Sequence, residues 1–172
     1  MAILLPQELR QPLPMIVGNI DYTDFQDTLE RISELISLSG IDKIVMQRAV
    51  DDAEKIAREK YEEPGEFPGL DYHSQIENQK RADLALRIMI IKELKGLAFR
   101  PLSCALAESQ LLQWFCKIDK IQIPSKSTLH RYEKMFAEEM IHDLIHELIV
   151  AASTPPSEEG ENQILLLEEE IS

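Results

Sequence analysis

Residues 80–136 read KRADLALRIMIIKELKGLAFRPLSCALAESQLLQWFCKIDKIQIPSKSTLHRYEKMF. Apolar residues recur there at helical spacing, and Gly, Pro and Ser interrupt them at short intervals, which is typical of several short helices joined by tight turns. The stretch is also basic, since residues 80–134 hold eleven Lys and Arg against five Asp and Glu, a balance of +6. The whole chain carries −13, so the remaining residues carry −19. A basic stretch in an acidic chain indicates a surface for an anionic partner.

The composition predicts a helical protein without a membrane role. The chain has 172 residues, of which 44% are hydrophobic and only six are Gly, and this favours helices around one buried core. Cys104 and Cys116 are expected to be reduced thiols in a cytoplasmic protein. No apolar run reaches the ~18–20 residues that cross a bilayer. The proline-containing residues 1–20 are expected to form an extended arm rather than a targeting peptide.

Residues 21–73 are predicted to form a helical hairpin and a loop. Asp21 or Thr23 can cap a helix that ends at Gly40, and a second helix starts at Asp42 and ends before the Pro and Gly residues of the loop. Nothing on these two helices suggests chemistry.

Residues 74–152 are predicted to form the core, beginning with a long central helix that Ser74 caps and Gly96 ends. A short helix with Pro101 in its first turn follows, then a third piece capped by Ser109.

The last predicted helix is capped by Ser125 or Ser127 and continues to about residue 152. Its apolar stripe consists of Leu129, Tyr132, Phe136, Met140, Leu144 and Leu148. Residues 153–172 are expected to form a disordered acidic linker or tail, whose glutamates are a solvated charge run rather than metal ligands.

Short helices followed by a Ser-capped helix with basic first turns are the pattern of a helix-turn-helix. A recognition helix enters the major groove by its N-terminal end, so hydroxyl and basic side chains are needed in its first turns. The predicted outward side chains are Lys126, Ser127, His130, Arg131 and Lys134. An ordinary capped helix with a solvated basic face explains these residues equally well.

Four segments of the chain resemble a known family. They are RIMIIKELKGL at 87–97, PLSCALA at 101–107, QWF at 113–115 and PSKSTLHRY at 124–132. In this order and spacing, over about a third of the chain, they resemble the N-terminal helix-turn-helix domain of insertion-sequence transposases of the Asp-Asp-Glu class. At 97–101 this chain has LAFRP where family members commonly have Leu-Ser-Asp-Arg-Glu.

The resemblance implies a homeodomain-like core that binds double-stranded DNA at the terminal inverted repeats of a mobile element. The family's RNase-H-like domain, with three carboxylates around two Mg²⁺ ions, would follow this chain, so we expect no catalysis and no cofactor in the chain itself. A homodimer is compatible with this role. The expected DNA contacts are Lys126, Ser127, Thr128, His130, Arg131 and Lys134, with phosphate contacts from Lys92, Lys95, Arg100, Lys117 and Lys120.

Two other functions are compatible with parts of this sequence. The basic face could dock an acidic partner, including the tail of another copy, in a helical interaction or oligomerisation module. A zinc-dependent hydrolase is the third hypothesis, because His142 and His146 have the i, i+4 spacing of a zinc-binding pair. It is disfavoured, since Asp143 stands where the zincin pattern has Glu and only glutamates follow as a third ligand.

Overall fold

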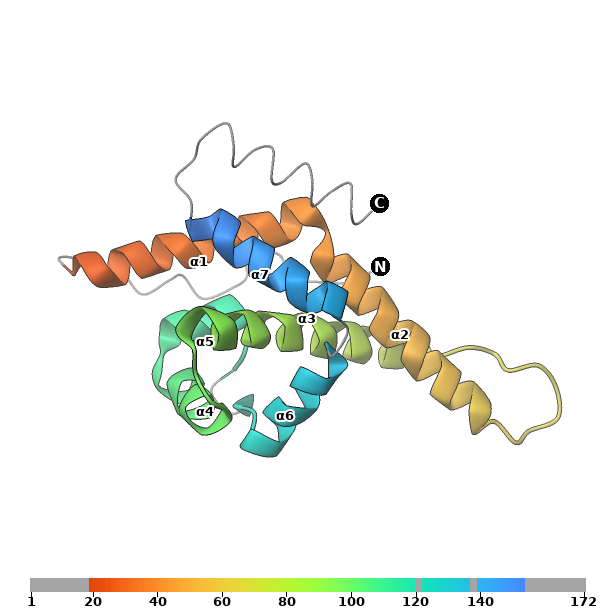
Figure 1. Cartoon of the computed structure of the whole chain (residues 1–172). Helices are drawn as coiled ribbons and strands as arrows, with labels where there is room; N and C mark the ends of the chain where they lie inside the picture. Colours follow the sequence, from red (N-terminus) through yellow and green to blue (C-terminus); the bar gives the residue numbers. More distant parts are fainter. Residues whose placement is uncertain (1–18, 120–121, 137–138, 154–172) are drawn as a thin grey trace.

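The computed structural model describes residues 19–119, 122–136 and 139–153, which form seven helices and no strand (Figure 1). The helices are α1 (Ile20–Ser39), α2 (Ile41–Glu59), α3 (Tyr72–Lys95), α4 (Phe99–Glu108), α5 (Gln110–Cys116), α6 (Lys126–Met135) and α7 (Glu139–Ser153). The all-α prediction is confirmed for this part of the chain. The predicted arm up to residue 18 and the predicted tail from residue 154 lie outside the described residues. None of the described helices is long and apolar enough to cross a membrane.

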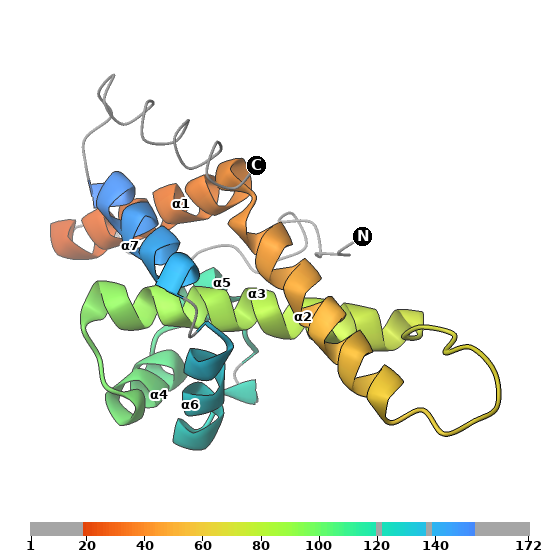
Figure 2. The ribbon, with the colours of Figure 1, turned by 45° about the vertical axis from the view of Figure 1, so that its right-hand side comes forward.

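Helix α3 is the centre of the fold, as its apolar sequence predicted. Helices α2, α5, α6 and α7 all contact it. Both views place α1 and α7 on one side of α3, with α4 and α6 on the other (Figures 1 and 2). Its buried apolar side chains are Ala82, Ala85, Leu86, Ile88, Met89, Ile90 and Ile91. Each fully buried Leu, Ile or Met contributes about 1.5–3 kcal/mol to folding, so this helix carries much of the stability.

The predicted hairpin of the first two helices is wrong. Only Gly40 separates α1 from α2, and one residue leaves too little chain for the second helix to return along the first. The long partner of α2 is α3, which follows it after the 60–71 loop, whereas α1 packs on α7 and α5 (Figure 2). One hydrophobic core therefore includes buried residues from all seven helices, and the predicted segments 21–73 and 74–152 share it.

Two of the predicted helix starts are corrected by the side-chain caps. Asn19, rather than Asp21 or Thr23, caps α1, and its side chain accepts a hydrogen bond from a backbone N–H of the first turn at 3.1 Å. Asp71, rather than Ser74, caps α3, and the Ser74 backbone N–H donates to it at 2.9 Å. The α1 cap lies two residues before Asp21 and four before Thr23, and the α3 cap lies three residues before Ser74. In both places several polar residues compete for the same unpaired N–H groups.

Two other caps follow the prediction. The Ser109 hydroxyl accepts a hydrogen bond from the Leu112 N–H at 3.2 Å, and the Ser125 hydroxyl accepts one from the Thr128 N–H at 3.4 Å. Of the two serines that could start the last segment, Ser125 is therefore the cap.

The last predicted helix is interrupted. Helix α6 ends at Met135, and α7 begins only at Glu139. Phe136 has φ −114° and ψ 28°, outside helical geometry, and its side chain is buried. Met140, which a continuous stripe would bury, is 47% exposed. The break lets α6 pack on α3 and α4 while α7 packs on α1 and α3, which one straight helix could not do.

We expect Gly40→Ala to destabilise the fold by about 1–2 kcal/mol, the cost of a left-handed backbone at a residue with a β-carbon. Gly40 has φ +70°, and an added Cβ would meet nothing within 4 Å, so the effect would be backbone strain alone. Urea denaturation followed by circular dichroism measures it. Gly40→Asn is the control and should lose less, because Asn adopts this conformation more readily. Equal stability of Gly40→Ala and the unsubstituted protein would contradict a left-handed joint between α1 and α2.

Candidate nucleic-acid interface

Helix α6 is held against the body of the fold by one apolar stripe. Leu129, Tyr132 and Phe136 are buried at i, i+3 and i+7, and the helix contacts α3 and α4. The segment before it is fastened to α4, because the Ser103 hydroxyl donates a hydrogen bond to the Pro124 carbonyl at 2.8 Å. The opposite face of α6 is therefore presented to solvent in a defined orientation.

That outer face carries Ser127, Arg131 and Lys134, at i, i+4 and i+7. At 100° per residue these positions lie opposite the stripe of Leu129 and Tyr132. All three side chains are exposed, and so is Lys126 in the first turn. The structure thus brings three of the predicted contact residues onto one solvent-facing strip, and Lys126 is exposed at the N-terminal end of the same helix.

A chain of hydroxyl groups runs from the helix cap to Arg131. Ser125 Oγ lies 3.0 Å from Ser127 Oγ and 3.1 Å from Thr128 Oγ1. Arg131 Nη2 donates to Thr128 Oγ1 at 3.1 Å. Thr128, which was predicted to contact DNA, is half-buried and supports the guanidinium of Arg131.

His130 lies at the flank of this face and contacts neighbouring elements. Its ring meets the Phe99 ring of α4 edge to face, with centroids 5.5 Å apart, and its Nδ1 is 3.8 Å from Glu133 Oε2. Lys92 of α3 joins the same group, with Nζ 3.6 Å from Glu133 Oε1 and 5.2 Å from the centre of the Phe99 ring. This cluster ties α6 to α3 and α4, so the Lys92 amine makes its contacts within the molecule.

The other predicted phosphate contacts are dispersed. Arg100 is exposed in the first turn of α4, and exposed Lys95 has its amine 4.8 Å from the Phe25 ring centre of α1. Lys117 is partly buried, and its Nζ lies 2.8 Å from Asp83 Oδ2, so its charge is paired within the fold. Lys120 lies outside the described residues.

The partner of Lys117 belongs to a buried ionic network that we did not predict. Arg87 Nε donates to Asp83 Oδ1 at 3.2 Å within α3, and Arg87 Nη1 reaches Ser33 Oγ of α1 at 3.2 Å and the Phe115 carbonyl of α5 at 3.0 Å. The network fastens three helices together. The sequence did contain a signal for this network, since Asp83 and Arg87 stand four residues apart in an otherwise apolar segment. Charged side chains in a buried helix segment must pair with each other.

Two further buried groups have shifted pKa values and no evident chemistry. Burial raises the pKa of the Cys116 thiol far above its usual value, which makes it unreactive. Burial also raises the pKa of Asp42, against the opposing effect of a hydrogen bond from the Lys43 N–H at 2.8 Å.

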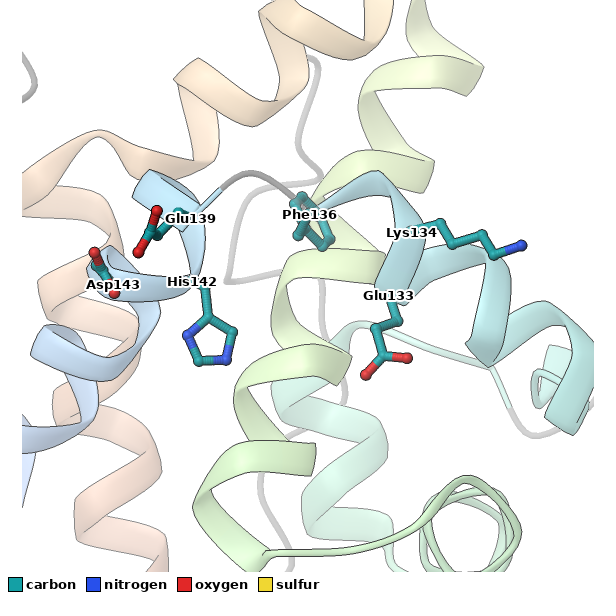
Figure 3. Close-up of a pocket in the computed structure, with 6 residues that line it drawn as sticks. All are labelled: Glu133, Lys134, Phe136, Glu139, His142 and Asp143. Carbon is teal, nitrogen blue, oxygen red and sulfur yellow. The ribbon is translucent and has the colours of Figure 1, made fainter.

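The two histidines of α7 do not meet a third ligand in the part of the chain that the structure describes. His142 projects from α7 towards Glu133 across an open recess of about 520 Å³, while Lys134 points away (Figure 3). His146 Nδ1 instead lies 3.0 Å from Glu93 Oε1 of α3. The described residues contain no group of three or more His, Cys, Asp or Glu placed to hold a metal ion. The described residues therefore give the zinc hydrolase no support.

Charge is separated across the molecule. Helix α1 has five acidic residues against one arginine, and α7 has three acidic residues and no lysine or arginine. These two helices pack together on the side of α3 opposite α6 (Figures 1 and 2). An anionic partner would be repelled from the α1 and α7 side and attracted to the α6 side.

Comparisons with protein families, with curated proteins and with solved structures found no match to this chain. The functional assignment therefore depends on the motif resemblance and on the geometry of α6.

Proposed function

We propose that this chain binds double-stranded DNA through the outer face of α6, as the N-terminal region of a transposase would at the ends of its element. The observation that carries the proposal is the position of Ser127, Arg131 and Lys134. They lie on the first two and a half turns of a helix whose other face is packed on α3 and α4. The inner face of this helix is packed on the fold, and its outer face carries basic residues and hydroxyls. These are the features that entry into a major groove requires.

The assignment of roles follows from the side-chain chemistry. Lys126 and Lys134 are exposed single charges at the two ends of the face, suited to backbone phosphates on either side of the groove. Arg100, at the start of α4, extends the basic surface beyond α6. The acidic helices α1 and α7 lie on the far side, where they orient the encounter without opposing the contact.

The expected result is that Lys126→Ala/Lys134→Ala weakens binding to a mixed-sequence duplex and reduces the salt dependence. Removing two phosphate contacts should reduce the slope of log K against log salt by about 2. Fluorescence anisotropy with a labelled duplex over a series of KCl concentrations measures both. Lys43→Ala/Lys55→Ala is the matched control, because it removes two exposed lysines from α2 and changes the net charge equally. No binding of the duplex by the unsubstituted protein at low salt, or equal slopes for both double variants, would contradict the proposal.

The separation of charge favours one second function, a module that associates with an acidic protein face, including that of another copy. The basic α6 face of one molecule would then meet the acidic α1 and α7 face of the next, a head-to-tail contact. Sedimentation of the protein without DNA distinguishes the two. Association that salt disrupts, in a protein that binds no duplex, would favour this function over DNA binding.

A further inference from the structure

We infer that Arg131 is the residue that reads DNA sequence, by a paired contact with the O6 and N7 atoms of one guanine, and that Thr128 positions it. The inference rests on the proposed function and goes further, because it names the base and separates sequence recognition from charge. Phosphate contacts by lysines carry no sequence information, so a basic face alone would bind all duplexes similarly.

Arg131 is the only residue on the outer face of α6 whose side chain is a planar fork of N–H donors. Such a fork matches the two acceptors that guanine presents in the major groove, whereas adenine, with one acceptor and one donor there, suits Asn or Gln. Neither Asn nor Gln occurs in α6. Glu133, which could accept from cytosine, is turned towards Lys92 of α3.

The guanidinium is also held in place before any DNA arrives. Its Nη2 donates to Thr128 Oγ1 at 3.1 Å, and that hydroxyl lies 3.1 Å from Ser125 Oγ, the cap of the helix. No carboxylate among the described residues forms an ion pair with Arg131, so its remaining donors are not committed to a charged neighbour. A side chain oriented in advance loses less conformational freedom on binding, which favours one base over the others.

The other cations of the region differ in this respect. Lys92 and Lys117 are paired with Glu133 and Asp83, and lysine offers a point charge without a fork. Arg100 belongs to α4 and not to the helix proposed to enter the groove. The structure thus assigns sequence reading to one position on α6.

The test is selection of duplexes from a library with a randomised central segment, using the full chain and three variants. Arg131→Lys keeps the charge and removes the fork, Thr128→Val removes the supporting hydroxyl at constant shape, and Thr128→Ser restores a hydroxyl. The unsubstituted protein should enrich one guanine at a fixed position and prefer it over adenine there by about 5- to 150-fold. Arg131→Lys should lose that preference, Thr128→Val should reduce it, and Thr128→Ser should retain it.

The outcomes separate the inference from the proposed function. The inference would be overturned if Arg131→Lys enriched the same motif as the unsubstituted protein, or if the unsubstituted protein bound duplexes without any sequence preference. Either result would leave duplex binding itself in place. No retained duplex at all would overturn both. Circular dichroism and the urea midpoint of each variant show whether it is folded, and Lys134→Ala, expected to lower affinity without changing the motif, is the control for charge.

Discussion

Asp83→Ala should lower the free energy of unfolding by about 3–5 kcal/mol, the usual cost of breaking a buried ion pair from one side. Asp83 is 2% exposed and Arg87 is 4% exposed, so neither can turn to water when its partner is lost. The substitution removes the carboxylate that both Arg87 and Lys117 contact, Arg87 Nε at 3.2 Å from Oδ1 and Lys117 Nζ at 2.8 Å from Oδ2. Urea denaturation followed by far-ultraviolet circular dichroism measures the change.

The matched control for this result is Asp143→Ala, which removes the same side chain from an exposed position on α7. It should alter the free energy of unfolding by less than about 0.5 kcal/mol. A double-mutant cycle of Asp83→Ala with Arg87→Ala should give a coupling energy of about 0.5–3 kcal/mol, because the two residues share one network. An Asp83→Ala protein as stable as the control would show that the network does not hold the helices together.

Phe136→Ala should destabilise the protein by about 3–5 kcal/mol, the range for truncating a large buried aromatic side chain. Phe136 is 7% exposed and ends α6 on the same buried stripe as Leu129 and Tyr132. Its loss should leave a cavity where α6 joins the hydrophobic core, and should lower the unfolding midpoint in urea.

Met140→Ala is the informative comparison, because Phe136 and Met140 both belong to the apolar stripe predicted from the sequence. Met140 is 47% exposed, so its truncation should change stability by less than about 0.5 kcal/mol. In a continuous helix both residues would lie on the buried face, and both substitutions would be costly. Two similar losses would therefore contradict the break between α6 and α7.

The stability tests address the core of the molecule, and the binding tests address its surface. Asp83 and Phe136 lie in the core, whereas Lys126, Arg131 and Lys134 lie on the outer face of α6. Loss of duplex binding in a surface variant with an unchanged urea midpoint would therefore report on the interface itself. That distinction matters because a destabilised core could also reduce binding.

Helix positions could largely be predicted from the sequence, because their signals are local. Gly40 and Gly96 end helices where the chain turns left-handed, and Ser109 and Ser125 cap the helices that follow them. These effects act within one helical turn and need no distant partner. The outward placement of Lys126, Ser127 and Arg131 followed from periodicity for the same reason, although their contact with DNA stays a proposal.

The partners of each helix were decided only by the tertiary structure. The same apolar stripe is compatible with one helix or with two. In the structure α6 packs beside α4 and α7 packs beside α1, and as a result Phe136 is buried whereas Met140 is exposed. Likewise, the sequence predicts Lys117 to be a basic surface residue. In the structure its amine lies 2.8 Å from the carboxylate of Asp83, which is thirty-four positions earlier in the chain. Periodicity shows which face of a helix avoids water, but the choice of what covers that face, and of which charges are neutralised there, depends on packing between residues far apart in the chain.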